Sequence, residues 1–368
     1  MTLHQRYGLT RVINARGPFT PLGVSRSSAA VGQAVAQALG EYFVLDELQD
    51  AFSRAVSRLT GAEAGAVSHC VAAGVTVSIA AAMTGMSPAL VAALPDTAGM
   101  ANRVVLPAPH DINYGHPITQ AIRLAGAVPV LAGTGEACSM DDLDTALGHP
   151  QTCCLLLVSS RLVHGEPADL ASAVARAHSR GIPVIIDAAG QDLRIEELLA
   201  TGADLVLVSA QKYMASPTAG LVVGRSDLVN AVRAQDKGIG RGMKATKEAI
   251  VGVLAAIEER EQLDLAQWSA TQHRKVLQLV DAANLLDGVT AQAITDPTDL
   301  PFSRAHVHVD GEAARLDAGT LCAVLQSGTP SIRVMEHELA NAELVFELVQ
   351  VDDRELQVVL ARLQELLT

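Results

Sequence analysis

Lys212 and Asp187 could together bind a cofactor covalently, because of their residue types and because each follows an apolar run typical of a buried strand. Lys212 follows the apolar run at residues 205–208, and Asp187 directly follows another at residues 184–186. A lysine amine can form a Schiff base with an aldehyde, and a carboxylate can keep a pyridine nitrogen protonated. The pair therefore predicts a site for pyridoxal 5'-phosphate (PLP), although each residue alone is also compatible with an ordinary strand end.

Short apolar runs alternate with amphipathic helices around these two residues. Strands are predicted at residues 104–106, 128–131, 153–158, 184–186, 205–208 and 221–223. Helices are predicted at residues 31–39, 46–59, 118–125, 140–147, 170–180, 195–199 and 228–234. Strands that are apolar throughout are buried on both faces, and helices between them require parallel crossovers. We expect an α/β fold with a mostly parallel sheet sandwiched by helices.

The pattern changes in the last third of the chain. Residues 248–286 have the length of one long helix or two, and after residue 289 the order becomes strand, strand, helix, strand, strand, helix. This order predicts a small α+β C-terminal domain. The expected domains are an N-terminal arm and helix (1–45), a large domain (46–262) and a linking helix with the small domain (263–368).

Further polar residues are expected near Lys212, because parallel sheets bind ligands at the carboxyl ends of their strands. Ser209 lies three residues before the lysine and is close enough to donate to a phosphate. His110 and His164 each follow a strand. The His110 imidazole could stack on a pyridine ring, although a loop histidine bonded to backbone is an equally good interpretation of either residue.

The segment Ser68-His69-Cys70-Val71 opens an uncharged stretch. Small residues at a helix start leave backbone N–H groups free to hold an anion such as a phosphate, although any buried capped helix has this pattern. Residues 64–95 contain no Asp, Glu, Lys or Arg. Their content of Ala, Gly, Ser and Thr favours a buried helix over a membrane span.

With these residues, the chain resembles the selenocysteine synthase-like branch of fold-type I PLP enzymes, which includes the D-glucosaminate-6-phosphate ammonia-lyase type. Matching segments include Val12-Ile-Asn-Ala-Arg-Gly17, Leu59-Thr-Gly-Ala-Glu-Ala64, Val163-His-Gly-Glu-Pro167, Pro183-Val-Ile-Ile-Asp-Ala-Ala189 and Gly240-Arg-Gly-Met-Lys-Ala-Thr-Lys-Glu248. The match covers about two thirds of the chain and weakens across the small domain.

The resemblance implies a role for each candidate residue. Lys212 would form the Schiff base with PLP, Asp187 would bind the pyridine nitrogen, and His110 would stack on the ring. The turn at Ser68, His69, Cys70 and Val71 would bind the phosphate together with Ser209. Arg241 and Lys244 would approach a cofactor or substrate anion, from the same or a neighbouring subunit.

Two segments beside Lys212 depart from the family pattern. Ala210-Gln211 stands where the family tends to have glycines, and Ser216-Pro-Thr218 stands where Gly-Pro-Gln is common. The substrate of this chain therefore cannot be inferred from the family. Arg333 lies in the small domain, where many fold-type I enzymes place an arginine for the substrate carboxylate; an arginine on an exposed strand is the alternative.

The composition excludes several classes of partner. The net charge of −13 argues against nucleic acid, because such binding depends on clustered Lys and Arg. The five cysteines lack the spacing of a disulfide framework or zinc site, so we expect reduced thiols, a cytoplasmic location and no metal. Residues 1–6 lack the apolar stretch of a signal peptide.

The expected activity is α-proton abstraction from a small amino acid, followed by α,β-elimination as in an ammonia lyase. An amino-acid racemase or epimerase and a β-replacing transferase are the enzymatic alternatives. A PLP-fold protein that only binds a ligand is the non-enzymatic one. Selenocysteine synthase activity itself is not expected from an acidic chain without a recognisable tRNA-binding domain. Fold-type I sites are completed by two subunits, so we expect at least a homodimer.

Overall fold

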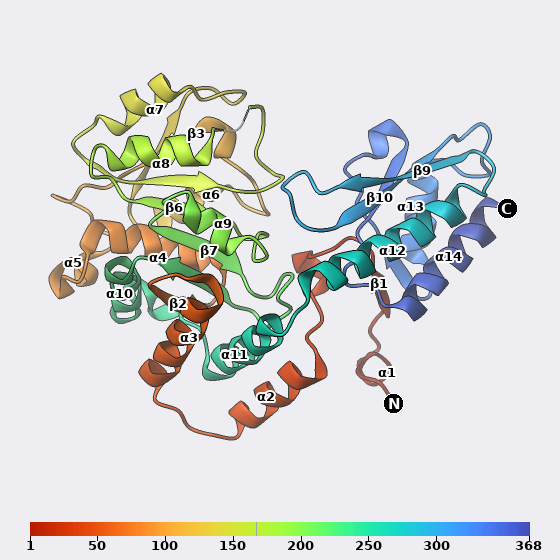
Figure 1. Cartoon of the computed structure of the whole chain (residues 1–368), viewed down its shortest axis with the longest axis horizontal. Coiled ribbons are helices and arrows are strands. Elements are labelled where there is room, and N and C mark those ends of the chain that lie inside the picture. Colours follow the sequence, from red (N-terminus) through yellow and green to blue (C-terminus); the bar gives the residue numbers. More distant parts are fainter. Residues whose placement is uncertain (167) are drawn as a thin grey trace. The chain divides into compact units, whose positions relative to one another are not determined.

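A seven-stranded sheet forms the centre of the larger of two structural units (Figure 1). Its strand order is β2-β8-β7-β6-β5-β3-β4. The strands are β2 (Ala64–Ser68), β3 (Arg103–Pro107), β4 (Val128–Ala132), β5 (Thr152–Val158), β6 (Val184–Asp187), β7 (Leu205–Ser209) and β8 (Gly220–Gly224). Strands β3 to β7 pair in parallel, whereas β8 is antiparallel to both β7 and β2. This arrangement confirms the predicted α/β fold.

The computed structural model describes every residue except Pro167, the last residue of the Val163-His-Gly-Glu-Pro motif. One unit comprises Ser27–Gln262, and the other comprises Met1–Arg26 with Leu263–Thr368. Helix α2 (Ala29–Leu39) lies in the larger unit. No helix among the described residues combines the length and apolarity needed to cross a bilayer.

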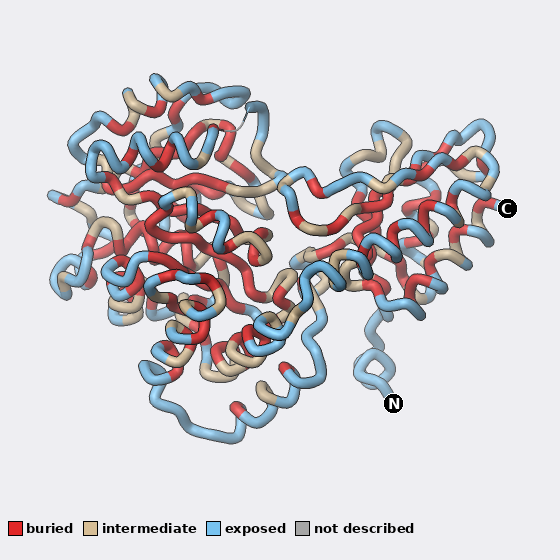
Figure 2. Tube along the Cα trace, viewed as in Figure 1, coloured by how far each residue is buried: buried red, intermediate tan, exposed pale blue. Residues whose placement is uncertain are grey.

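Helices cover both faces of the large sheet. Those of this unit are α2 (Ala29–Leu39), α3 (Leu45–Thr60), α4 (Val71–Thr84), α5 (Pro88–Ala93), α6 (Ile118–Leu124), α7 (Met140–Leu147), α8 (Leu170–His178), α9 (Ile195–Ala200), α10 (Ser226–Ala234) and α11 (Lys247–Glu261). One apolar cluster joins the sheet to α2, α3, α7, α8, α9 and α11, and a second joins it to α4, α6 and α10. The sheet is therefore buried on both sides (Figure 2).

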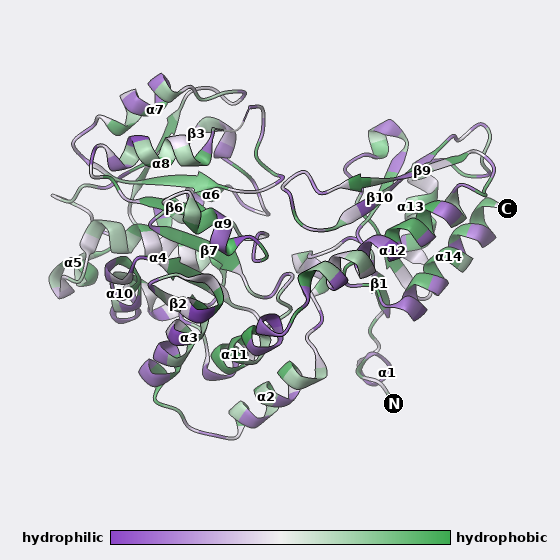
Figure 3. Cartoon of the chain, viewed as in Figure 1, coloured by the Kyte–Doolittle hydropathy of each residue, from purple (hydrophilic) through white to green (hydrophobic). Residues whose placement is uncertain are grey.

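Strand β7 illustrates why these strands are apolar between their ends. Val206 and Val208 pack into one cluster, Leu205 and Leu207 pack into the other, and all four are fully buried. Successive strand residues point to opposite faces, so a strand covered on both sides has no position for a polar residue. Figure 3 shows the same strands as hydrophobic ribbons.

The smaller unit is built on an antiparallel sheet with the order β12-β10-β9. Its strands and helices are β9 (Val289–Thr295), β10 (Ser303–Val309), β12 (Glu343–Phe346), α1 (Leu3–Tyr7), α12 (Leu265–Ala283), α13 (Ala318–Ser327) and α14 (Asp353–Leu367). Strand β1 (Val12–Asn14) pairs in parallel with β11 (Ser331–Arg333). Short 3-10 turns in the chain are η1 (Thr20–Leu22), η2 (Ala108–His110), η3 (Gln235–Lys237), η4 (Ile239–Gly242) and η5 (Leu339–Asn341).

Strand β8 aligns the ends of its two neighbours. Because β8 is antiparallel to both β2 and β7, these two run in the same direction and end at the same rim. Ser68 and Ser209, the last residues of β2 and β7, both pair with Gly220. A Cβ atom on Gly220 would come within 2.3 Å of the carbonyl carbon of Cys70. The turn after β2 therefore packs directly on a residue that has no side chain.

This contact predicts that Gly220→Ala destabilises the larger unit. The added methyl would displace the backbone at Cys70, which we expect to cost about 1–3 kcal/mol of unfolding free energy. Denaturant unfolding measures the change. The control is Gly32→Ala in helix α2, where a Cβ would have no neighbour within 4 Å. Equal stability of the two variants would contradict the packing described.

Candidate active site

Asp187 lies at the end of β6, between β5 and β7 in the sheet. It is 4% exposed, and one carboxylate oxygen accepts a hydrogen bond from the N–H of Ala189 at 3.1 Å. Burial raises the pKa of Asp187 to about 6, and the charge of Lys212 opposes that rise. The Lys212 amine lies 3.7 Å from the position that a Cβ on Gly190 would occupy. The predicted lysine and aspartate are thus close together at one rim.

The turn that carries Lys212 follows β7 directly. The N–H of Lys212 donates to the carbonyl of Ser209 at 2.9 Å. Ala210 is fully buried, and its N–H donates to the carbonyl of Ala219 at 3.1 Å. The side-chain oxygen of Gln211 accepts from the N–H of Ala219 at 2.7 Å. The unusual Ala210-Gln211 pair thus closes the lysine turn onto the start of β8.

Helix α11 supports the same turn. A Cβ on Gly252 would lie 2.5 Å from a ring carbon of Pro217, so the helix packs closely on the Ser216-Pro-Thr218 segment. Arg260 donates to the buried carboxylate of Asp192 at 2.9 Å. Burial raises the pKa of Asp192, and Arg260 and the backbone N–H of Tyr213, beside the lysine, oppose the rise. Sequence reasoning did not identify this ion pair, because its partners are far apart in the chain.

The turn between β2 and α4 presents free backbone donors. Cys70 is the N-cap of α4, and its side chain caps none of the N–H groups of the first turn. The Ser68 hydroxyl donates to the carbonyls of Cys70 at 3.0 Å and Gly220 at 3.1 Å. Ser68 therefore holds the turn in place, and the backbone from Val71 onward is what remains available to an anion.

The segment after η4 lies against this turn. Lys244 forms a backbone bridge with Ser68, and the N–H of His69 donates to the carbonyl of Met243 at 2.7 Å. The His69 side chain is exposed. The charges of Lys244 and Arg241 act on the half-buried Asp236, whose pKa burial raises. The predicted cationic pair is thus near the turn between β2 and α4 of its own chain, with Asp236 as an acidic neighbour.

His110 is fully buried beside the aspartate. Its Nδ1 accepts a hydrogen bond at 2.9 Å from the N–H of Val158, and Val158 pairs with Asp187 across β5 and β6. Burial lowers the pKa of His110 to about 4. The ring is therefore neutral with its proton on Nε2. His164 is exposed, and its N–H donates to the carbonyl of Pro109 at 3.1 Å.

Tyr114 lies near Asp187 and Cys70, and the sequence alone did not indicate this position. It lies in the loop that carries His110, and Asp187 and Cys70 both act electrostatically on its hydroxyl. That hydroxyl is buried and has no hydrogen-bond partner among the described residues. Its position after a strand that ends at the rim was the only signal for it in the sequence.

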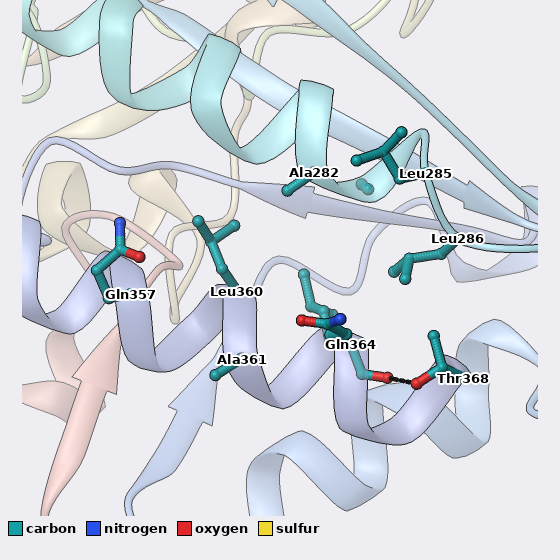
Figure 4. Close-up of a pocket in the computed structure, with 10 residues that line it drawn as sticks. Ala282, Leu285, Leu286, Gln357, Leu360, Ala361, Gln364 and Thr368 are labelled. Carbon is teal, nitrogen blue, oxygen red and sulfur yellow. Dashed lines mark hydrogen bonds between the residues drawn. The ribbon is translucent and has the colours of Figure 1, made fainter.

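Arg333 belongs to the smaller unit. It lies on β11 opposite Asn14, and its Nε donates to the Ser331 hydroxyl at 2.9 Å. This unit also contains a cavity of about 380 Å³ between α12 and α14 (Figure 4). Its lining is Ala282, Ala283, Leu285, Leu286, Gln357, Leu360, Ala361, Leu363, Gln364 and Thr368. None of these residues has a titratable side chain, so the cavity is not a candidate for chemistry.

The residues at the rim of the large sheet fit PLP. They offer an amine for its aldehyde, a buried carboxylate for its ring nitrogen, a neutral aromatic ring and a helix start with uncapped N–H groups. Among the described residues, no group of three or more His, Cys, Asp or Glu is placed to hold a metal ion. This fold and site define a PLP-dependent enzyme of fold type I.

The sequence profile of the L-seryl-tRNA selenium transferase family matches residues 118–365, and the chain belongs to this family. D-glucosaminate-6-phosphate ammonia lyase of Salmonella typhimurium (strain 14028s / SGSC 2262) is 33% identical over 365 residues, covering 99% of this chain and 97% of the relative. A Streptomyces 5'-C-glycyluridine monooxygenase-decarboxylase is also 33% identical, over 374 residues that cover 99% and 92%. A solved D-glucosaminate-6-phosphate ammonia-lyase structure superposes with a TM-score of 0.89, at 33% identity, over 100% of this chain and 98% of that one.

The raised pKa of Asp187 predicts a pH-dependent stability of the cofactor-free protein. The carboxyl has a pKa of about 6 when folded, against an ordinary value of 3.8. Between these values the folded state binds more protons, so the free energy of unfolding falls as the pH rises. Asp187→Asn has no carboxyl that titrates at this position, so its free energy of unfolding should not fall in this way. The free energy of unfolding of the variant minus that of wild type should therefore increase by on the order of 2–3 kcal/mol from pH 4 to pH 7.

Denaturant unfolding of the cofactor-free proteins across this pH range measures the difference. The matched control is Asp96→Asn, at an exposed position of the same unit. Its stability should follow the wild-type profile. Parallel profiles of wild type and Asp187→Asn would contradict the burial of an ionisable carboxyl at this position.

Proposed function

We propose that this protein is a PLP-dependent lyase that removes the α-proton of a small amino acid and then eliminates a β-substituent. The observation that carries the proposal is its similarity over the full length to D-glucosaminate-6-phosphate ammonia lyase, with Lys212 and Asp187 both in place. Relatives of equal identity have different names and reactions, so the proposal concerns the reaction type and leaves the substrate open.

The rim residues have distinct roles in this proposal. When bound, PLP supplies an electron sink for the charge left at Cα after proton removal. Lys212 would hold the cofactor, and its amine, once the amine of the substrate has displaced it, would take the α-proton. Asp187 would keep the ring nitrogen protonated, which its burial beside Lys212 supports. The neutral ring of His110, oriented by the hydrogen bond from Val158 to its Nδ1, would pack on the cofactor ring.

Anionic groups of the ligands would be bound by backbone and by cations. The N–H groups from Val71 onward and the Ser209 hydroxyl would hold the cofactor phosphate. Arg333 would bind the substrate carboxylate, a planar group that guanidinium binds well. Arg241 and Lys244, with His164, would bind a second polar or anionic group of the substrate, which the phosphorylated substrate named for the relative supports.

Three alternative functions compete with the proposed lyase activity. A β-replacing transferase is favoured by the matched family profile, and a racemase or epimerase needs the same Lys212 and Asp187. A non-enzymatic PLP-fold protein would bind a ligand without turnover. The tRNA substrate named for the family is not part of the proposal, because the net charge of −13 opposes binding of a polyanion.

Lys212 should be the only residue that covalently attaches the cofactor. Borohydride reduction of the PLP-loaded protein is expected to leave a pyridoxyl group on the peptide that contains Lys212, detected by mass spectrometry. Lys212→Ala should lack this label and lose α-proton exchange, while Lys237→Ala at an exposed position should keep both. Ammonia and a keto acid from β-substituted amino acids would support the lyase. Deuterium entering Cα from solvent without net consumption would instead support a racemase.

We also propose that the chain assembles at least as a homodimer in the cytoplasm. A homodimer is supported by an apolar stretch on the large unit, where Leu39, Tyr42 and Val44 are 60%, 102% and 59% exposed. The cytoplasmic location is supported by five free cysteines. Sedimentation of the holoenzyme should give at least twice the chain mass, and a Tyr42→Glu, Val44→Glu double variant should shift it toward monomer. A monomeric wild type would contradict this assembly.

A further inference from the structure

The loop after His110 holds Tyr114 in a fixed position. It connects η2 to α6 and begins at the carboxyl end of β3, a strand parallel to β5 and thus ending at the Asp187 rim. The Tyr114 N–H donates to the carbonyl of His116 at 3.3 Å, and the two rings meet edge to face with centroids 4.6 Å apart. The backbone and the ring of Tyr114 are therefore both anchored.

The hydroxyl of this anchored ring has nothing to bind. It is buried, and the described residues offer it no hydrogen-bond partner. Nε2 of His110, four residues earlier, is buried and unpartnered as well. Oδ1 of Asp111 is the third such atom on this loop. Buried polar atoms are nearly always hydrogen-bonded, so these orphan atoms indicate a polar ligand between them and the sheet.

The neighbours of the Tyr114 hydroxyl indicate which part of the ligand it meets. Burial raises the pKa of Tyr114 above its ordinary value, and the charges of Asp187 and Cys70 raise it further. The phenol is therefore neutral and can donate to an anion. Asp187 is the proposed partner of the ring nitrogen, and Cys70 caps the helix proposed to hold the phosphate. In PLP, a single ring carbon separates the ring nitrogen from the carbon that carries the phosphate arm. A group near both Asp187 and Cys70 would therefore lie on this side of the cofactor.

We propose that Tyr114 is a cofactor-binding residue whose hydroxyl donates a hydrogen bond to the PLP phosphate, beside the N–H groups at the start of α4. The inference rests on the proposed placement of the phosphate at that helix. It gives Tyr114 no part in proton transfer at the substrate. It also explains why the phenol is buried without a hydrogen-bond partner in the described part of the chain.

The test compares two forms of the cofactor on cofactor-free protein. Tyr114→Phe keeps the ring and removes the hydroxyl. The Kd for PLP is expected to rise about 10- to 100-fold, the range for one hydrogen bond to a charged group. The Kd for pyridoxal, which lacks the phosphate, should stay unchanged. Tyr7→Phe, at a tyrosine that is 62% exposed, is the matched control and should change neither Kd.

A second measurement keeps the test valid if folding is affected. Because the hydroxyl has no hydrogen-bond partner among the residues that the structure describes, cofactor-free Tyr114→Phe should be at least as stable as wild type to denaturant. Loss of stability would mean that the hydroxyl has a structural role and would overturn the inference. So would an unchanged Kd for PLP, or an equal rise in Kd for PLP and pyridoxal. Failure of the proposed function is distinct, because wild type itself would then not bind PLP through Lys212.

Discussion

The carboxylate of Asp187 is held out of water at the end of a central strand, and the rest of the site is arranged around this electrostatic constraint. Lys212 offsets only part of the cost, since the pKa of the buried carboxyl still rises to about 6. A cationic partner inside the site would stabilise the ionised form. The protonated ring nitrogen of PLP is such a partner. The buried carboxylate therefore destabilises the cofactor-free protein and favours a cofactor whose ring nitrogen carries a proton.

The register of the strands positions the other residues of the site relative to Asp187. Asp187 pairs with Val158 on one side and with Leu207 on the other, and Val158 in turn fixes the His110 ring. At the far side of β7, the reversed strand β8 brings the end of β2 to the same rim, where Gly220 lets the Cys70 turn approach. The amine, the carboxylate, the aromatic ring and the helix start are therefore set by backbone pairing.

The sequence predicted the elements with strong patterns. Strands buried on both faces are apolar between their ends, so β3 and β5 to β8 were visible, and the rule for parallel sheets placed Asp187, Lys212 and His110 together. Strand β2 was missed because the residues Ala64-Gly-Ala-Val-Ser68 are small and continue into an uncharged helix. A strand and a buried helix segment of such residues have the same composition.

Roles that depend on three-dimensional contacts could not be predicted. Ser68 donates to backbone carbonyls, a use that its place in the sequence does not distinguish from phosphate binding. Gln211 closes the lysine turn only because β8 returns beside it. Tyr114 has no sequence signal beyond its place after a strand, and its orphan hydroxyl is evident only in the folded chain.

The protonation state of the bound cofactor's ring nitrogen shows whether the buried carboxylate of Asp187 acts on PLP. It can be measured by NMR on PLP labelled with nitrogen-15 in the ring, bound to wild type and to Asp187→Asn. We expect the chemical shift of a protonated pyridinium in wild type at neutral pH, and an unprotonated nitrogen in the variant. An unprotonated nitrogen in wild type, or the same shift in both proteins, would contradict this role of Asp187.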